Sequence, residues 1–333
     1  MIRTGRGGVR WTLAALFVGL CAAFPGASVD QLRIARTRNN SPRVGSAGLS
    51  VLRDGVWTRW WDLSGAPRRW DGPLATVTDA ISWRPTSDAG VQWGELRLSG
   101  SGEAWRVRVI IARIDPGLVR IRLDTAFDGS IAHAAWTTDH APLDAILAVN
   151  AGQFVGSLPW GWVVMNGRQF LKPGTGPLAT AIVIDSAGAV NWIETARMPS
   201  AVSMHGIVDA FQSYPTLLRG DGDVPEPLQP DHATPALDIA HRDARLAIGQ
   251  SRDGHLLIAI TRFDALDGTF DYVPFGLTTP EMAAVMGALG CKQAVMLDGG
   301  ISSQMMIRLP SGERMRWRGI RRVPLGLLVL PRD

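Results

Sequence analysis

The sequence predicts an α+β fold with a mixed, mainly antiparallel β-sheet and few helices. Segments that alternate apolar and polar residues, or are continuously apolar, outnumber segments with helical periodicity. Turns rich in glycine and proline separate these segments at short intervals, as in chains of hairpins. The 333 residues, 46% of them hydrophobic, suffice for one large domain or two moderate ones with a sizeable core.

The N-terminus has the pattern of a secretory signal peptide. Arg3, Arg6 and Arg10 precede an almost unbroken apolar stretch, residues 11–24, which small residues follow. This stretch is shorter than the roughly 20 residues that a membrane-spanning helix needs. We therefore predict a cleaved signal peptide over residues 1–27 and export to the periplasm or the outside. An inner-membrane protein anchored by residues 11–24 is the alternative, and an uncleaved signal is the only predicted contact with a membrane.

Charge and cysteine content exclude several functional classes. Without the three arginines of the signal, the 34 basic residues fall to 31 against 30 acidic ones, so no nucleic-acid partner is predicted. After cleavage Cys291 is the only cysteine, and we expect it to be a buried thiol without a disulfide. No Cys or His cluster has the spacing of metal ligands, so we predict no metal and no other cofactor.

Residues 28–102 are predicted to be a linker followed by a Trp-rich β region of short strands and turns. Packing in the core or at sheet edges is the simpler explanation for the tryptophans, and stacking on sugar rings is the alternative. The tryptophans concerned are Trp57, Trp60, Trp61, Trp70, Trp83 and Trp93.

Residues 103–331 are predicted to form the larger, catalytic domain. Residues 105–111 and 119–123 alternate around a turn at residues 115–117, and we expect them to pair as a hairpin. Two more hairpins and two strands buried on both faces follow from similar patterns. The hairpins join residues 181–185 with 190–193 and residues 245–249 with 255–260, and the buried strands are residues 145–149 and 294–297.

The clearest helix begins near Thr278. Thr278 and Glu281 have the spacing of a capping box, and proline is tolerated in the first helical turn. Apolar residues recur at helical spacing from Met282 to Leu289, and Gly290 is placed to end the helix.

Two of the buried strands end in a polar residue and a glycine-containing turn. The turns are Asn150–Phe154 and Asp298–Ser303. Strand ends can present polar groups to a ligand, and glycines let backbone N–H groups approach it closely. Asp-Gly is also a common hairpin turn, so this pattern alone fits either a binding site or a structural turn.

Five motifs in this order resemble the phosphodiester glycosidase (NAGPA-domain) family. The motifs are Asn150–Phe154, Gln212–Leu217, Arg245–Gly249, Gly276–Ala283 and Leu297–Ser303. The resemblance covers about residues 103–331. It implies a hydrolase that removes a sugar from a sugar-1-phosphodiester in envelope or extracellular glycans, with a carbohydrate or phosphosugar as its partner.

The chain departs from the family pattern at several positions. Ala151 and Gln153 stand where the first motif has Gly and Phe, and no proline precedes Arg245. Ile301 replaces the third glycine of the last motif, which adds a bulky side chain beside the expected pocket. These departures bear on the substrate more than on the fold.

The resemblance and the chemistry of hydrolysis together suggest roles. Asp298 is the predicted carboxylate for acid–base or charge-stabilising work. Arg245 suits a phosphate, because its planar fork pairs two oxygens at once, although a surface ion pair is the alternative. Glu281 is predicted as a second catalytic carboxylate, with helix capping as the alternative.

The remaining candidates contact the substrate or carry a proton. Asn150 and Gln212 are expected to bind sugar hydroxyls, with turn capping as the alternative. His205 and His241 are candidates for a general acid, and structural or exposed positions are the alternative. The other predicted substrate contacts are Gly152, Gly299, Gly300, Ser302 and Ser303.

Other functions stay open at this point. A non-catalytic protein that binds or assembles exopolysaccharide in the cell envelope would keep the same pocket for recognition, and Ile301 favours it. A glycosidase without preference for phosphate is a further alternative. Asp298 and Arg245 favour the phosphodiester glycosidase.

Overall fold

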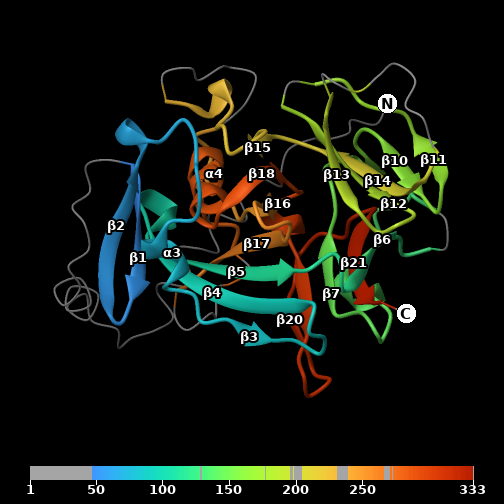
Figure 1. The fold of residues 1–333 in the computed structure, drawn as a ribbon, viewed down its shortest axis with the longest axis horizontal. Helices are drawn as coiled ribbons and strands as arrows, with labels where there is room; N and C mark the ends of the chain where they lie inside the picture. The colour runs from blue at the N-terminus through green and yellow to red at the C-terminus, as the bar shows by residue number, and fades with distance from the viewer. Residues whose placement is uncertain are drawn as a thin grey trace, which may run out of the picture. The chain divides into compact units, whose positions relative to one another are not determined.

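A nine-stranded antiparallel sheet organises the computed structural model, which describes residues 47–332 apart from 128–129, 177, 196–197, 199–204, 231–238, 266–270 and 272. The predicted signal peptide, residues 1–27, lies outside the described residues. In spatial order the strands are β15 (Thr216–Leu218), β18 (Cys291–Met296), β16 (Leu246–Ser251), β17 (Leu256–Phe263), β5 (Val107–Ile114), β4 (Val91–Ser99), β1 (Gly48–Arg53) and β2 (Val56–Asp62), with β3 (Arg84–Pro85) paired to β4 (Figure 1).

Two five-stranded sheets and a short hairpin complete the β-structure of the described residues. One sheet runs β11 (Arg168–Leu171), β10 (Val163–Met165), β14 (Ile207–Ser213), β12 (Thr180–Asp185) and β13 (Val190–Glu194). The other runs β20 (Arg314–Trp317), β19 (Met305–Arg308), β7 (Leu147–Asn150), β21 (Gly326–Pro331) and β6 (Val119–Asp124). The hairpin joins β8 (Phe154–Val155) to β9 (Leu158–Pro159). Every strand pair within the described ranges is antiparallel, which confirms the predicted, mainly antiparallel fold class.

Strand β5 separates two hydrophobic cores, because successive side chains of a strand point to opposite faces. Ile110, Ala112 and Ile114 enter a core that all three large sheets share. Val109 and Ile111 enter a second core, where the apolar residues of the helix α4 (Thr279–Ala288) cover the other face of the nine-stranded sheet. This burial on both faces explains why six of the eight residues of β5 are apolar.

Helices are few and short in the described part of the chain. Besides α4 there is one α-helix, α3 (Ala75–Thr78), and the 3-10 turns are η1 (Leu63–Gly65), η2 (Gly102–Ala104), η3 (Thr138–His140), η5 (Glu226–Leu228) and η7 (Gly300–Ser302). Helix α4 begins at the predicted capping box of Thr278 and Glu281. Gly290, at φ +90°, follows its end as predicted. Among these residues no helix has the length and apolarity to cross a membrane.

The predicted strands are present, but one predicted pairing is wrong. Strands β12 and β13 pair, as do β16 and β17, which confirms two of the expected hairpins. Strands β5 and β6 flank the expected turn and lie in different sheets. Both edges of β5 are taken, by β4 and β17, so β6 pairs with β21 instead.

The Trp-rich region adds strands to the nine-stranded sheet and does not stand apart from it. Strand β4 pairs with β5 from Val91 to Leu98, and β1 pairs with β4. Trp61, Trp70 and Trp93 are buried, consistent with packing in the core. Whether residues 103–331 form a domain that folds alone stays a prediction.

Candidate active site

Asp298 lies where the nine-stranded sheet meets strand β7. Its neighbour Leu297 continues β18 and donates a backbone hydrogen bond to Leu246 O of β16, at 2.8 Å. The Asp298 amide faces Ala151 O, directly after β7, at 3.5 Å. The two strand-end turns predicted from the sequence are therefore side by side.

The Asp298 carboxyl group is mostly buried and only partly hydrogen-bonded. Among the described residues, its Oδ2 atom is shielded from solvent and has no hydrogen-bond partner. The pKa of Asp298 is raised to about 6, chiefly by burial; a hydrogen bond from Ser302 and the positive charge of Arg321 oppose the rise, and the charge of Asp243 adds to it. A carboxyl group with this pKa can both hold and release a proton near neutrality.

Asp243 is a second carboxylate at this site. His241, Asp243 and Arg245 occupy alternate positions in the segment that leads into β16, and the charges of His241 and Arg245 both act on the Asp243 carboxyl group. His241 Nε2 lies 3.8 Å from Asp243 Oδ2. A Cβ atom added to Gly300 would lie 2.7 Å from the same oxygen. Burial raises the pKa of Asp243, although Arg245 and His241 oppose the shift.

Arg245 is half-buried beside Asp243 and anchored to the segment before α4. Its Nε donates to Leu277 O at 2.8 Å, and its Nη2 donates to His241 O. The Arg245 amide donates to Thr261 Oγ1 at 2.6 Å. These bonds fix the guanidinium next to the Asp243 carboxylate, whose pKa it lowers.

Asn150 and Gln153 tie the first turn to the second. Asn150 is fully buried, where its Nδ2 donates to Asp298 O at 2.8 Å and its Oδ1 accepts from Gln304 N at 2.9 Å. Gln153 Nε2 donates to Leu297 O at 3.0 Å. In this structure both side chains hold backbone groups of the site.

Gln212 has a similar structural environment. Its Oε1 accepts from Trp162 N at 3.0 Å and Gly174 N at 2.8 Å, and its Nε2 donates to Gly174 O and Thr195 Oγ1. These four bonds fill the hydrogen-bonding capacity of an amide side chain. A bond from Gln212 to a sugar would have to replace one of them. Gly152 is packed beside it, since an added Cβ would lie 2.6 Å from Gln212 O.

The turn that follows Asp298 is held closely by its surroundings. Gly300 N donates to Ala244 O at 2.6 Å, and a Cβ at Gly299 would lie 2.6 Å from the same oxygen. Ser302 and Ser303 are both buried. Ser302 bonds to the Asp298 carboxyl group. Ser303 Oγ instead donates to Gly300 O at 2.8 Å.

A buried arginine supports the end of this turn. Arg262 Nη1 donates to Ser303 Oγ at 2.9 Å, and Nη2 donates to Ser303 O at 2.7 Å. Burial lowers the pKa of Arg262 to about 10. The predicted phosphate or sugar contact of Ser303 therefore competes with a structural bond.

Both carboxylate oxygens of Glu281 are hydrogen-bonded within the protein. Its Oε2 accepts from Thr278 N at 2.9 Å in the capping box and from Arg242 Nη1 at 2.6 Å, and its Oε1 accepts from Arg242 Nη2 at 2.8 Å. The side chain is 1% exposed. In this structure Glu281 caps α4, as the alternative proposes, and the structure gives no support to its predicted catalytic role.

Arg321 is a charged residue near Asp298 that none of the sequence motifs includes. The amides of Ile320 and Arg321 donate to Ile301 O at 2.8 and 2.9 Å, which brings this loop onto the Asp298 turn. The exposed Arg321 guanidinium lies 4.6 Å from the centre of the Phe154 ring, and its charge lowers the pKa of Asp298. It therefore adds an accessible cation between the two turns.

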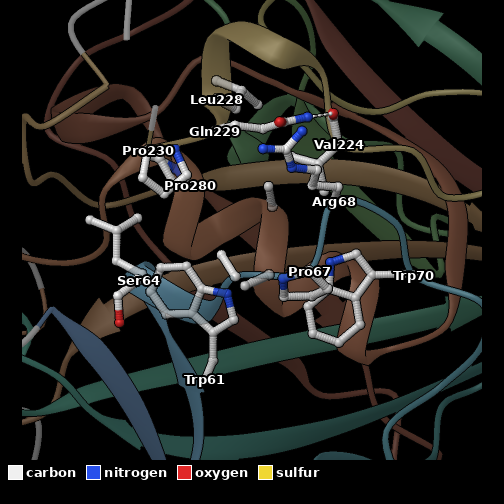
Figure 2. A pocket seen from close by; sticks show the side chains of 14 residues that line it. Trp61, Ser64, Pro67, Arg68, Trp70, Val224, Leu228, Gln229, Pro230 and Pro280 are labelled. Carbon is white, nitrogen blue, oxygen red and sulfur yellow. Dashed lines mark hydrogen bonds between the residues drawn. The ribbon is translucent and has the colours of Figure 1, made fainter. Parts of the chain in front are cut away.

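A cavity in the described part of the chain lies apart from these residues. It has a volume of about 280 Å³ and is walled by Trp61, Trp70 and Pro280, with the side chains of Arg68 and Gln229 at one side (Figure 2). None of the predicted site residues lines it. Two of the tryptophans considered for sugar stacking thus line a pocket of their own.

Other predictions concern metals, histidines and the thiol. No group of three or more His, Cys, Asp and Glu side chains in the described ranges is arranged to hold a metal ion. His205 lies in an exposed turn before β14, whereas His241 joins the site. Cys291 is buried, as predicted, and burial raises the pKa of its thiol.

Three residues of the site are absent from the predicted set, and two of them have a signal in the sequence. Asp243 is a carboxylate two residues from each of His241 and Arg245, both of them predicted site residues. Gln153 belongs to the first motif, where an amide in place of phenylalanine is a polar group at a strand end. Arg321 belongs to none of the five motifs, so only long-range packing places it beside Asp298.

Comparison with known proteins bears on the family and the fold. The chain matches the phosphodiester glycosidase (NAGPA) family over residues 144–330, more than half of its length. No curated protein sequence matches the chain significantly.

Among the solved structures that share the fold are the following two. One is the catalytic domain of zebrafish N-acetylglucosamine-1-phosphodiester α-N-acetylglucosaminidase, auto-inhibited by its pro-peptide. It is 17% identical, with a TM-score of 0.55 over 76% of this chain and 88% of that one. The other is a protein from Burkholderia pseudomallei described as exported, 14% identical, with a TM-score of 0.52 over 80% of this chain and 100% of that one. At these identities the likeness shows the fold alone, whereas the family match shows that the chain belongs to the phosphodiester glycosidase (NAGPA) family.

Proposed function

We propose that the protein is an exported hydrolase that removes a sugar from a sugar-1-phosphodiester in envelope or extracellular glycans. The observation that carries the proposal is the buried Asp298 carboxyl group, whose pKa of about 6 suits proton transfer near neutral pH. Membership of the family supports the reaction class.

The hydrolysis breaks the bond between the anomeric carbon and the phosphate oxygen. Water supplies a hydroxyl group to the carbon, and its remaining proton goes either to the departing phosphate oxygen or to solvent, in which case that oxygen leaves as an anion. Asp298, protonated in part near pH 6, is the proposed proton donor. Asp243, beside Gly300, is the proposed second carboxylate, in place of Glu281, and stabilises the positive charge that develops on the sugar.

Two arginines are proposed to bind the phosphate. Arg245 is fixed beside Asp243, and Arg321 is exposed beside Asp298, so cations flank both carboxylates. Guanidinium groups match the geometry of phosphate oxygens. This arrangement supports a charged phosphodiester over a neutral glycoside as the substrate.

Export is supported by the signal-peptide pattern of residues 1–27. The structural likeness to a Burkholderia protein described as exported is consistent with it. Detection of the mature protein outside the cytoplasm, with a new N-terminus near residue 28, would test this part of the proposal.

A non-catalytic protein that binds exopolysaccharide is the second candidate. Ile301, in the turn that follows Asp298, is 43% exposed, and its bulky side chain stands where the family pattern has a glycine. The test is sugar release by the purified mature protein from sugar-1-phosphodiesters and matched aryl glycosides, with Asp298→Asn as the control. Release from the diesters alone, lost in the variant, supports the proposal. Saturable sugar binding without release from any substrate would favour the second candidate.

A further inference from the structure

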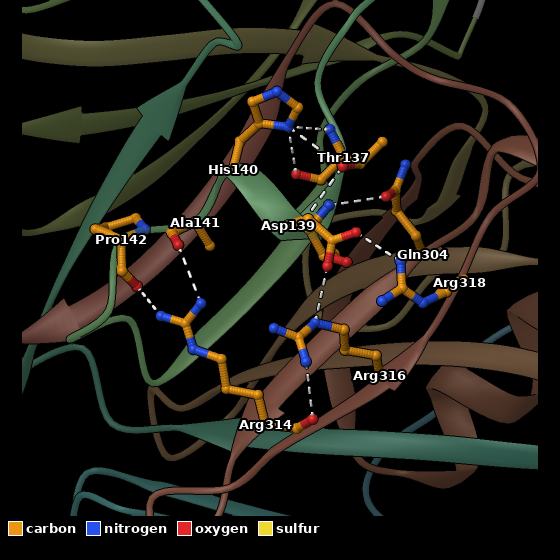
Figure 3. Close-up of polar contacts among 10 residues, drawn as sticks. Thr137, Asp139, His140, Ala141, Pro142, Gln304, Arg314, Arg316 and Arg318 are labelled. Carbon is orange, nitrogen blue, oxygen red and sulfur yellow. Dashed lines mark hydrogen bonds and ion pairs between the residues drawn. The ribbon is translucent and has the colours of Figure 1, made fainter.

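Four arginines gather on the hairpin of β19 and β20, three of which Figure 3 labels. Arg314, Arg316 and Arg318 alternate along and just beyond β20, so their side chains share one face. Arg308 of β19 lies directly opposite Arg314 in the strand register. We call these four residues the arginine row.

The charge of the arginine row is only partly neutralised. Asp139 pairs with Arg316 Nε at 3.1 Å and with Arg318 Nη1 at 2.5 Å. Arg314 bonds to two backbone carbonyl groups, of Ala141 and Pro142, which carry no net charge. Burial and the neighbouring arginines lower the pKa of Arg314, although two acidic side chains oppose the shift. Like charges directly opposite each other on a sheet cost stability, and a binding function would account for that cost.

The arginine row is connected to the candidate active site. Thr138 N, next to the Asp139 that pairs with the row, donates to Gln304 Oε1 at 2.9 Å. Gln304 N donates in turn to Asn150 Oδ1, and Asn150 holds the backbone of Asp298. The row therefore lies at one end of a hydrogen-bonded chain that leads to the candidate proton donor.

The loop that follows β20 makes a second connection. Arg318, at the end of the row, is followed three residues later by Arg321. The charge of Arg321 acts on Asp298. Positive charge thus continues along the chain from the row to the proposed phosphate site.

We propose that the arginine row binds anionic groups of a polymeric substrate, a glycan with repeating phosphodiester groups, on one side of the scissile bond. This inference rests on the proposed function and names the substrate class. Guanidinium groups spaced along a strand can each pair with successive phosphates. Trp317, between two of the arginines, is 4% exposed, so this strand offers no ring for stacking nucleic-acid bases.

The test compares a polymer of sugar-1-phosphate units with a short alkyl sugar-1-phosphodiester. The triple variant Arg314→Gln, Arg316→Gln, Arg318→Gln is expected to raise KM for the polymer by a factor about ten times that for the short diester. The reason is that the ion pairs between these arginines and phosphates of the polymer are lost, each of them of modest strength. The corresponding triple lysine variant should recover much of the difference, since it keeps the charge.

A matched control and a direct binding assay keep the test decisive. Arg97→Gln removes a 58% exposed arginine that pairs with Asp264, and it should change neither KM. Binding of the polymer is also measured by fluorescence anisotropy with rising salt, and this assay tests the arginine row without any hydrolysis. If the wild-type protein hydrolyses nothing but binds the polymer through the row, the proposed function alone is rejected. If the glutamine variant does not fold, Arg318→Glu, at a 66% exposed position, replaces it. Equal effects on polymer and short diester, or tighter binding of single-stranded DNA than of the polymer, would overturn the inference.

Discussion

At the residue scale, the site depends on a carboxyl group that folding buries without fully pairing it. Asp298 Oδ2 has no hydrogen-bond partner among the described residues. Ser302 and Arg321 offset only part of the desolvation cost. Such a group destabilises the folded protein when it is ionised, and a role in catalysis accounts for that cost.

This burial predicts how stability depends on pH. The pKa of Asp298 is raised in the folded protein to about 6 from 3.8, so its protonated form stabilises the fold at low pH. That contribution, about 3 kcal/mol, is lost as pH rises from about 4 through about 6. Urea unfolding at pH 4 and pH 7 should show the loss in the wild-type protein and a much smaller loss in Asp298→Asn. The same loss in both proteins would contradict the assignment.

The two candidate phosphate ligands should respond differently to substitution. Arg321→Gln should raise KM for a phosphodiester about tenfold and leave stability nearly unchanged, because the side chain is exposed. Arg245→Gln should also lower stability, because it removes donors from Leu277 O and His241 O. Kinetics and thermal unfolding of both variants, with binding of the neutral free sugar as the control, would check this. An equal loss of affinity for the neutral sugar would argue against a phosphate contact.

At the element scale, α4 is fixed to the site by one buried ion pair. Arg242 and Glu281 have side chains that are 12% and 1% exposed. Glu281→Ala should therefore destabilise the protein by about 3–5 kcal/mol, because it leaves a buried charge unpaired and removes the capping box. The pH profile of kcat should keep its shape if Glu281 positions α4. Loss of an ionisation from that profile, with stability intact, would restore the catalytic role.

The same scale shows what can be predicted from sequence. Periodicity and capping predict the strands and the α4 helix, because those signals are local. The predicted pairing of β5 with β6 is wrong, because a turn does not reveal that both edges of β5 are occupied. The strand-end turns identify Asn150 and Asp298, and Asp243 lies close in sequence to two predicted site residues, whereas Arg321 reaches the site only through contacts between distant segments.

At the scale of the whole molecule, the N-terminal strands complete the nine-stranded sheet. Eight residues of β4, Val91–Leu98, pair with β5, whose side chains fill both cores. A fragment of residues 103–333 would expose this edge and the apolar residues beneath it. We expect the fragment to be insoluble or unfolded by circular dichroism, with residues 47–333 as the folded control. A stably folded fragment would establish the predicted boundary at residue 103.

The overall charge gives no sign of the arginine row. Without the three signal arginines, the chain has 31 basic residues against 30 acidic ones, so its overall charge is nearly balanced. Three of the four arginines alternate in the sequence from Arg314 to Arg318, and the pairing of β19 with β20 adds Arg308 opposite Arg314. Composition therefore describes the average surface and does not locate a charged face.

The position of bond cleavage tests the central claim most directly. A sugar-1-phosphodiester is hydrolysed in water enriched in the heavy oxygen isotope, and both products are analysed by mass spectrometry. A phosphodiester glycosidase breaks the bond between the anomeric carbon and oxygen, so the label is predicted in the sugar and not in the phosphate product. Label in the phosphate product would show cleavage of the phosphorus–oxygen bond and contradict the proposed reaction.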